Sequence, residues 1–366
     1  MSLSILGIGT ATPPRQIAQA DAAALAASFI CGPAPARTLA AIYRQTRIRA
    51  RGSVLLEEPG DRGYSQTFFA PASQETPSGP STAARMQRYA AEAGPLAVRA
   101  AQQAVSDATV QAAEITHLVT CSCTGFVSPG VDIELIDNLG LKPTVTRTHI
   151  GFMGCHAAFN ALRVAHAYAQ ADQTCIPLVV CVELCSLHFQ YGPRSDLIVS
   201  NSIFADGAAA VVGTGAQACL PHGWILRRQW SHVLPDSTAA MGWTIGDHGF
   251  EMQLAATVPA TVARHLPGIV DRALAEAGLG RGDVALWAVH PGGPRVLAGV
   301  AEALDLPADA LAASWDVLAD HGNMSSGTIL FILERLMRGG NRGPCLALAF
   351  GPGLTVELAL FAPASV

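Results

Sequence analysis

Residues 117–141 read HLVTCSCTGFVSPGVDIELIDNLGL, which combines an apolar strand, a loop with Pro and Gly, and a helix closed by Gly140. A helix over 97–108 precedes them. Residues 260–306 repeat this order with a helix, the strand ALWAV, the loop HPGGP and a second helix. Both strands are apolar runs without alternation, as expected of strands buried on both faces. The repeat predicts two α/β halves packed against each other.

Further strands are expected outside the repeat. Three apolar runs read as buried strands: 3–8, 178–182 and 208–212. Near the C-terminus, 345–350 and 354–361 flank Gly-Pro-Gly and predict a hairpin. The segment 51–80 is rich in Gly, Pro, Ser and Thr, and we expect an irregular surface excursion there.

Composition narrows the class of protein. Of the 366 residues, 50% are hydrophobic and 14% are charged, which suits a compact protein with a large core. The net charge of −5 argues against a nucleic acid as the main partner. The N-terminus lacks the basic and apolar regions of a secretory signal. No run reaches the roughly 18 apolar residues that a membrane span needs.

The nine cysteines are odd in number and have no framework spacing, which fits a reducing compartment. We therefore expect a cytoplasmic protein. Cys121 and Cys123 form a CxC pair, but no second pair at zinc-ligand spacing accompanies them. No metal site is expected on this evidence.

The stretch GFMGCHAA at 151–158 delivers Cys155 through a glycine-flanked turn into a helix expected from about Ala157 to Ala169. The positive end of a helix and its unpaired N–H groups favour a thiolate. The glycines allow a tight turn and a close approach of substrate. Taken alone, this is moderate evidence, because a buried cysteine is more often an inert small hydrophobe.

Two further segments favour a catalytic role. His290 ends a strand and enters Pro-Gly-Gly-Pro, and ligands bind at such strand ends in open α/β sheets. Asn323, in HGNMSSG, immediately precedes an apolar helix expected over 328–336. A cysteine, a histidine and an asparagine supply a nucleophile, a proton-transfer partner and a donor for an oxyanion.

The chain resembles the type III polyketide synthases, the chalcone-synthase-like family of the thiolase superfamily. Five collinear motifs carry the resemblance: GFMGCHAAFNALRVA around Cys155, IFADGAAAVVG at 203–213, AVHPGGPRVL at 288–297, HGNMSSGTILFIL at 321–333 and FGPGLTVE at 350–357. The resemblance implies a duplicated five-layered αβαβα fold. Residues 1–214 would form a half carrying the cysteine, and residues 215–366 a half carrying the histidine and asparagine.

The family implies that Cys155 attacks an acyl-CoA starter and carries the growing chain. His290 and Asn323 would stabilise the enolate formed when malonyl-CoA loses carbon dioxide, and His290 would pair with the Cys155 thiolate. The product would be a pyrone or a resorcinol- or phloroglucinol-type ring, made by a cytoplasmic acyltransferase of secondary metabolism. CoA thioesters are substrates, and no permanently bound cofactor is implied.

The resemblance also assigns the cavity. Phe204 matches the aromatic gatekeeper between the CoA tunnel and the cavity, and Met252 falls where plant enzymes often carry a second Phe. The flexible Met252 thioether would loosen that wall. His188 replaces a small cavity-lining residue. The loop 121–129, which includes Cys123, and the segments around 241–252 and Ser325 would complete the lining.

The sequence gives weaker evidence for the residues that bind CoA and for partner proteins. Arg44, Arg47, Arg49 and Arg51 could bind CoA phosphates, or form a solvated basic face. Arg295 is a further candidate. Ser128 falls where the family reaches across a homodimer, and a carrier protein is an alternative source of starter.

Several titratable residues are expected to be structural. The histidines of this group are His149, His156, His166 and His321. Glu183 and Asp206 are expected to satisfy backbone groups.

Three rival functions remain open. The first is a β-ketoacyl carrier-protein synthase III type initiator, which the Phe204 segment and FGPGLTVE disfavour. The second is a papain-like Cys-His-Asn hydrolase, which would lack the repeat. The third is a catalytically dead ligand-binding relative, which would not need all three residues.

Overall fold

The computed structural model describes residues 2–29, 36–58, 65–75, 77–216, 223–340 and 343–363. Its main sheet has nine strands in the order β11-β12-β13-β8-β1-β7-β6-β4-β5. The strands of this sheet are β1 (Leu3–Ala11), β4 (His117–Ser122), β5 (Thr146–Gly151), β6 (Pro177–Leu184), β7 (Asp206–Thr214), β8 (Trp224–Val233), β11 (Leu286–Val289), β12 (Cys345–Gly351) and β13 (Thr355–Pro363).

The sheet consists of two similar halves. In one, β1 pairs antiparallel with β7, β7 antiparallel with β6, and β6 parallel with β4. In the other, β8 pairs antiparallel with β13, β13 antiparallel with β12, and β12 parallel with β11. The halves join where β1 pairs with β8 over Leu3, Ser4 and Ile5.

The connections repeat as well. In the first half, α3 (Thr82–Asp107) leads through the 3-10 turn η1 (Ala112–Glu114) and β4 to α4 (Val131–Leu139). In the second, α7 (Val258–Glu276) leads through η3 (Arg281–Asp283) and β11 to α8 (Pro294–Leu304). The same carboxylate-to-backbone hydrogen bond closes the 3-10 turn in both halves. The Glu114 carboxylate accepts from the Gln111 N–H at 2.7 Å, and the Asp283 carboxylate accepts from the Gly280 N–H at 2.8 Å.

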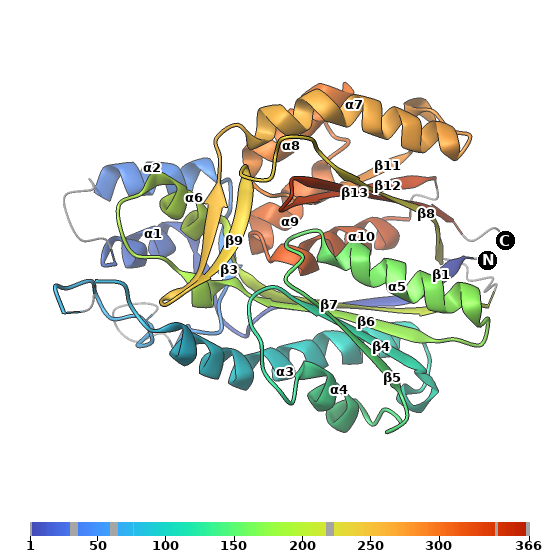
Figure 1. Ribbon diagram of the computed structural model, residues 1–366, viewed down its shortest axis with the longest axis horizontal. Coiled ribbons are helices and arrows are strands. Elements are labelled where there is room, and N and C mark those ends of the chain that lie inside the picture. The colour runs from blue at the N-terminus through green and yellow to red at the C-terminus, as the bar shows by residue number, and fades with distance from the viewer. Residues whose placement is uncertain are drawn as a thin grey trace.

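Helices and half-sheets alternate in five layers (Figure 1). The outer layers are α3 with α4 and α7 with α8. Between the half-sheets lie α5 (Ala157–Ala171) and α10 (Thr328–Arg338), whose side chains share one buried cluster with both half-sheets. Alanines at 157, 161, 165 and 169 recur every fourth residue of α5 and are fully buried, so the helix fits closely between two sheets. The predicted duplicated αβαβα fold is confirmed.

The remaining elements gather mainly at the end of the layers away from both termini (Figure 1). The helices outside the layers named above are α1 (Gln19–Ala27), α2 (Ala36–Gln45), α6 (Ser195–Ile203) and α9 (Ala312–His321), with the 3-10 turns η2 (Cys185–His188) and η4 (Ser325–Gly327). The small sheets are β2 (Gln16–Ala18) with β3 (Ala50–Gly52), and the hairpin β9 (Met241–Gly246) with β10 (Gly249–Leu254).

The expected elements are present, with longer boundaries. The first strand continues to Ala11, and the helix expected over 97–108 begins at Thr82 and accommodates Pro95. The C-terminal hairpin forms as β12 and β13. In the segment 51–80, the described residues (51–58, 65–75 and 77–80) contain only the end of β3 as regular structure, whereas 59–64 and 76 lie outside the described residues. Within the described ranges, no helix is both long and apolar enough to cross a membrane.

Candidate active site

Cys155 lies on the turn between β5 and α5. Phe152 and Gly154 adopt positive φ values of 62° and 84°, which reverse the chain within four residues. A Cβ on Gly154 would lie 2.5 Å from Cδ of Pro352, so only glycine fits between this turn and the loop joining β12 to β13. The Gly154 N–H donates to the Cys123 thiol at 2.9 Å. The Cys155 side chain that this turn presents is 9% exposed.

Asn323 and Ser325 reach Cys155 from the loop before α10, and their side chains hydrogen-bond the thiol. The Asn323 backbone is fixed to the end of α6. Its N–H donates to the Ile203 carbonyl at 2.8 Å, and its carbonyl accepts from the Ala205 N–H at 2.9 Å. The Asn323 Oδ1 accepts from the Ser325 N–H at 2.9 Å. The amide group of Asn323 is thereby oriented as a donor, because its oxygen is already bonded.

His290 follows β11 and is 1% exposed. Its N–H donates to the Leu348 carbonyl of β12 at 2.8 Å, which fixes the backbone. Neither ring nitrogen has a hydrogen-bond partner among the described residues. The ring lies within electrostatic range of His156, the residue after Cys155. A buried, unpartnered imidazole is costly, and such groups are concentrated at functional sites.

Burial sets the charge of both groups. It raises the pKa of the Cys155 thiol to about 11, against the smaller lowering by hydrogen bonds from Ser325 and Asn323. It lowers the pKa of His290 to about 3, with a further lowering from His156. Burial therefore outweighs the helix terminus that was expected to favour a thiolate. These shifts favour a neutral Cys155 thiol and a neutral His290 imidazole at pH 7.

Glu183 ties three segments of the site together. Its carboxylate accepts from the Cys123 N–H at 3.0 Å, from the Thr124 hydroxyl at 2.8 Å and from the Ser326 hydroxyl. It is fully buried, and burial raises its pKa. Asp206 plays a similar part by accepting from the N–H groups of Val54 and Ser186 at 2.8 and 2.7 Å. Both carboxylates thus accept from backbone N–H groups, and their structural role stays a prediction.

His188 is locked in the cavity wall. Its Nε2 lies 2.7 Å from the Thr124 carbonyl, and its Nδ1 accepts from the Phe250 N–H at 2.9 Å. These partners assign the proton to Nε2. The ring stacks on Phe250 with centroids 4.1 Å apart. His188 therefore joins η2, the loop after β4 and the hairpin β9–β10.

His188 is expected to make the protein less stable in acid. Burial lowers its pKa to about 3, whereas in the unfolded chain the imidazole binds the proton near its ordinary pKa of 6.5. Unfolding therefore takes up a proton between these values, and the free energy of unfolding falls as the pH falls through this window. His188→Gln should make the slope of unfolding free energy against pH shallower by about 1.4 kcal/mol per pH unit.

Urea unfolding at pH 6.5, 5.5 and 4.5 measures this slope. His248→Gln, at an exposed position of the hairpin, is the control and should keep the wild-type slope. Equal slopes for wild type and His188→Gln would mean that His188 does not hold its neutral form in the folded state.

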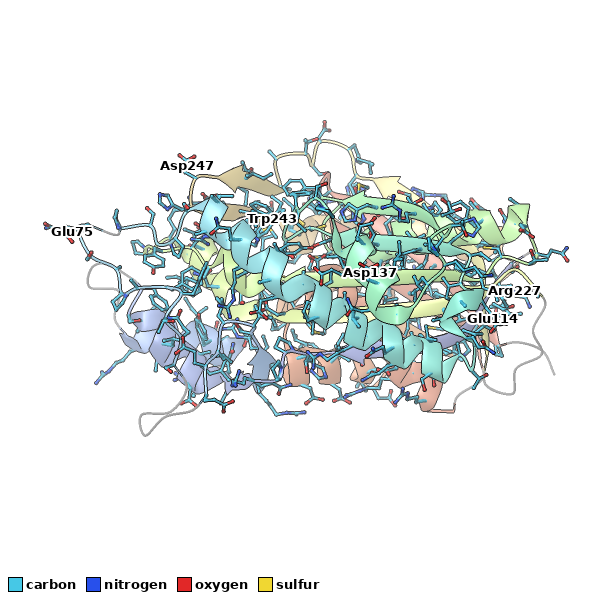
Figure 2. All side chains as sticks on the ribbon, turned by 90° about the horizontal axis from the view of Figure 1, so that it is seen from below. Glu75, Glu114, Asp137, Arg227, Trp243 and Asp247 are labelled. Atoms are coloured by element: carbon cyan, nitrogen blue, oxygen red, sulfur yellow. The ribbon has the colours of Figure 1, made fainter. Side chains whose placement is uncertain are left out.

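A cavity borders the site along α6 and the hairpin. Phe204, His188 and Met252 line it, together with Trp243 and Cys185, and their gatekeeper and cavity roles stay predictions. Cys123 and Ser325 contact the Cys155 turn instead. Trp243 faces Met252 across the hairpin and donates from Nε1 to the Cys123 carbonyl at 2.8 Å. Figure 2 shows Trp243 toward the end of the molecule that carries the hairpin tip at Asp247, opposite Glu114 and Arg227.

Sequence reasoning did not single out Trp243 or Cys185. The segment 241–252 was expected to line the cavity, but which of its residues face inward depends on the pairing of β9 with β10. Cys185 follows β6 directly in the 3-10 turn η2, so its position at a strand end was a signal that could have identified it.

The arginines between 44 and 51 differ in how deeply their side chains are buried. Arg51 is buried, and its guanidinium donates to the carbonyls of Asn201 and Phe204 at 2.7 and 2.6 Å. It therefore supports the gatekeeper backbone. Arg49 pairs with Asp320. Arg47 is exposed and stacks over Trp315 at 4.7 Å, and Arg295 is exposed on the first turn of α8.

The structural histidines have local contacts. The His149 Nδ1 lies 2.9 Å from the Thr120 hydroxyl, and the His156 Nδ1 lies 3.0 Å from the Asn160 amide oxygen. His321 contacts the Phe331 ring, with centroids 5.2 Å apart, and His166 lies on α5. Among the residues that the structure describes, no group of three or more His, Cys, Asp or Glu side chains could hold a metal ion.

Two family models match the chain. The N-terminal domain of chalcone and stilbene synthases covers residues 2–217, and their C-terminal domain covers residues 226–363. The chain belongs to the chalcone and stilbene synthase family. It is a type III polyketide synthase and thus an acyltransferase. Membership sets aside the hydrolase alternative, and the match to these particular domains favours a polyketide synthase over an initiator of the synthase III type.

Two curated relatives cover nearly the whole of this polyketide synthase. The alpha-pyrone synthesis polyketide synthase-like Pks18 of Mycobacterium tuberculosis is 34% identical over 98% of this chain and 90% of its own length. The 1,3,6,8-tetrahydroxynaphthalene synthase of Streptomyces peucetius subsp. caesius is 33% identical over 98% and 92%.

Solved structures of type III polyketide synthases have the same fold. The crystal structure of PKS-I from the brown alga Ectocarpus siliculosus matches with a TM-score of 0.93 and 31% identity, over 99% of this chain and 98% of that one. The C-terminal type III polyketide synthase domain of Steely1 from Dictyostelium matches with a TM-score of 0.88 and 26% identity, over the whole of both chains.

Proposed function

We propose that this synthase loads an acyl-CoA starter on Cys155, extends it with malonyl-CoA and cyclises the product to a pyrone or a resorcinol- or phloroglucinol-type ring. The observations that carry the proposal are the convergence of Asn323 and Ser325 on the Cys155 thiol and the buried, unpartnered imidazole of His290, which lies within electrostatic range of His156. Acyl-CoA and malonyl-CoA are the substrates of the family.

In the loading step, the Cys155 proton passes to His290 as the sulfur attacks the starter carbonyl. The tetrahedral intermediate collapses with loss of the CoA thiolate, which takes the proton from His290. Because the low dielectric around both groups disfavours charge, a proton transfer within the pair avoids a lasting separation of charge. The starter is then a thioester on Cys155.

In the extension step, malonyl-CoA loses carbon dioxide, and the electron pair of the broken bond forms an enolate. The Asn323 amide and a His290 N–H donate to the enolate oxygen. The enolate carbon attacks the Cys155 thioester and expels the thiolate, and the lengthened chain returns to Cys155 for another round. Oriented donors in a dry site stabilise such an oxyanion by about 3 kcal/mol each.

Arg47 and Arg295 are proposed to bind the CoA phosphates. Both are exposed, and the Arg47 guanidinium lies over the Trp315 ring, 4.7 Å from its centroid; a guanidinium can bind a phosphate by bidentate hydrogen bonds. We also propose a division into residues 1–214 and 215–366, and a cytoplasmic location. Seven free, buried cysteines among the described residues support a reducing compartment.

Mass spectrometry of the products tests the proposal. Purified enzyme receives malonyl-CoA and starter CoAs of graded length. Ring products that contain several added two-carbon units are the expected result. A single β-ketoacyl product, or turnover only with carrier-protein thioesters, would instead indicate an initiator of the synthase III type.

A homodimer is proposed from the exposed surface beside the site. Phe126, Val127 and Met153 are 44%, 37% and 40% exposed, and they lie on the loops that follow β4 and β5. The neighbouring Ser128 would face the partner, and β5 is an edge strand of the sheet. Apolar groups beside an unpaired edge are typical of an interface. Light scattering should give twice the 38.0 kDa of the chain, and a monomer would refute the dimer.

A further inference from the structure

His156, expected from the sequence to be structural, lies among polar groups that the proposed reaction steps do not use. It is 2% exposed and is the N-cap residue of α5. Asn160 and Arg163 follow four and seven residues later, so the three side chains share one face of the helix. The His156 Nδ1 lies 3.0 Å from the Asn160 amide oxygen, and the Arg163 guanidinium pairs with Glu357 of β13 at 2.5 Å.

Strand register places His290 and Glu357 on the same face of the sheet. Ala288 of β11 pairs with Ala347 of β12, and both belong to the buried cluster around α5. His290 and Ala349 each lie two residues further along, and Ala349 pairs with Glu357. Side chains two residues apart in a strand point to the same face, so His290, Ala349 and Glu357 form a row across three strands.

The His156 ring lies over the middle strand of this row. A Cβ on Gly351 would lie 2.2 Å from Cδ2 of His156 and 2.9 Å from its Nε2, so the ring covers the bare backbone of Gly351. Gly351 lies two residues after Ala349, on the same face of β12. These two small residues leave room for the imidazole between His290 and Glu357. His156 accordingly lies within electrostatic range of both.

The hydrogen bond to Asn160 assigns the tautomer of His156. Because the Asn160 amide oxygen can only accept, Nδ1 carries the proton and Nε2 is an acceptor in the neutral ring. Burial lowers the pKa of His156, whereas the Asn160 hydrogen bond and Glu357 raise it and Arg163 lowers it. The resting ring is therefore neutral at pH 7, and its Nε2 can take up a proton near the Glu357 carboxylate.

Glu357 connects His156 to the surface of the protein. Its buried carboxylate accepts from the Ser231 hydroxyl at 2.7 Å, and Ser231 is exposed on β8. A series of polar side chains thus runs from solvent at Ser231 through Glu357 and His156 to His290.

The extension step consumes one proton in each round. A malonyl carboxylate and a thioester become carbon dioxide, a β-ketoacyl-CoA and the Cys155 thiolate. When this thiolate attacks the β-ketoacyl-CoA, it takes the chain and releases CoA as a thiolate, which must gain a proton. The first loading from an acyl-CoA has no such need, because the Cys155 thiol itself supplies the proton.

We propose that His156 relays the proton for extension: its Nε2 takes up a proton from the side of Glu357 and passes it to His290, which protonates the departing CoA thiolate. Both imidazoles end neutral. The two rings are not hydrogen-bonded to each other, so one water molecule between them completes the path. His156 acts only through His290, as a residue that positions the proton. The inference rests on the proposed function, because it needs a thioester on Cys155 and the decarboxylation of malonyl-CoA.

His156→Gln tests the relay, because glutamine is polar but cannot carry a proton. Ring formation from malonyl-CoA should slow on the order of 10²-fold, the size of a general acid–base contribution. It should slow further in D₂O than the wild type does. Loading of Cys155 without malonyl-CoA, followed by intact-mass spectrometry after rapid quenching, should keep the wild-type rate. His166→Gln is the matched control, ten residues further along α5, and should change neither rate.

The split between loading and extension separates a relay from a structural role. A structural role would slow both steps together, because His156 adjoins Cys155 in the chain. Equal slowing of both steps in His156→Gln would therefore overturn the relay and leave the proposed function intact, and so would extension at the wild-type rate. A thermal melt checks folding, and His156→Asn takes the place of His156→Gln if that variant does not fold. Absence of loading in the wild type with every acyl-CoA would overturn both proposals.

Discussion

Cys155→Ala is expected to abolish thioester loading and to lower ring formation by a factor on the order of 10⁴ or more, because it removes the proposed attachment point of the acyl chain. The thiol lies at the point where Asn323 and Ser325 converge, so its loss leaves these donors without a nucleophile. Intact-mass spectrometry after incubation with acyl-CoA measures loading, and product analysis measures the rings.

Cys345→Ala is the matched control. Cys345 is fully buried at the start of β12, so its removal deletes a buried thiol of the same size far along the strand from the site. Loading should persist in this variant. Acyl loading that survived in Cys155→Ala would mean that another cysteine, most simply Cys185 in the cavity wall, is the nucleophile.

Asn323→Asp should lower kcat about 10²- to 10³-fold by removing one of the two donors to the enolate oxygen. Aspartate keeps the oxygen that accepts from the Ser325 N–H, so the loop before α10 should retain its shape. It replaces the amide donor by an acceptor at the position where negative charge develops. Release of carbon dioxide from malonyl-CoA should fall by this factor, whereas loading of Cys155 should be much less affected.

Asn138→Asp provides the control for this change. Asn138 is exposed on α4, where its amide donates to the Glu134 carbonyl at 2.8 Å, far from Cys155 in the fold. Decarboxylation should be unchanged in it. Wild-type decarboxylation in Asn323→Asp would show that the amide does not stabilise the enolate, and the role would pass to His290 alone.

Local signals made much of the fold predictable. The repeat of strand, loop and helix around 117–141 and 260–306 is visible in the sequence. Apolar runs mark its buried strands, and residues close in sequence mark the ends of its helices. The turn before Cys155 has a local signal as well, because its glycine at 154 readily adopts the left-handed conformation that the turn requires. These features therefore led directly to the two halves and to the cysteine, histidine and asparagine of the site.

Tertiary packing decided what the sequence could not predict. The sequence places Cys155 at the N-terminus of a helix, which lowers the pKa of a thiol. The burial that instead raises this pKa depends on all the segments around the thiol. The orientation of His188 depends on the Thr124 carbonyl and the Phe250 N–H, which lie 64 and 62 residues away in sequence. The inward position of Trp243 depends on hairpin pairing in the same way.

Two contacts of the site join segments that are far apart in sequence. The His290 N–H donates to the Leu348 carbonyl, and Gly154 packs against Pro352. Both contacts affect how the site forms during synthesis on the ribosome. Cys155 leaves the ribosome well before Leu348 and Pro352, which lie much further along the chain. A nascent chain thus carries the thiol without its proton acceptor or its amide donor. We therefore expect acyl loading of Cys155 only after β12 and β13 have paired.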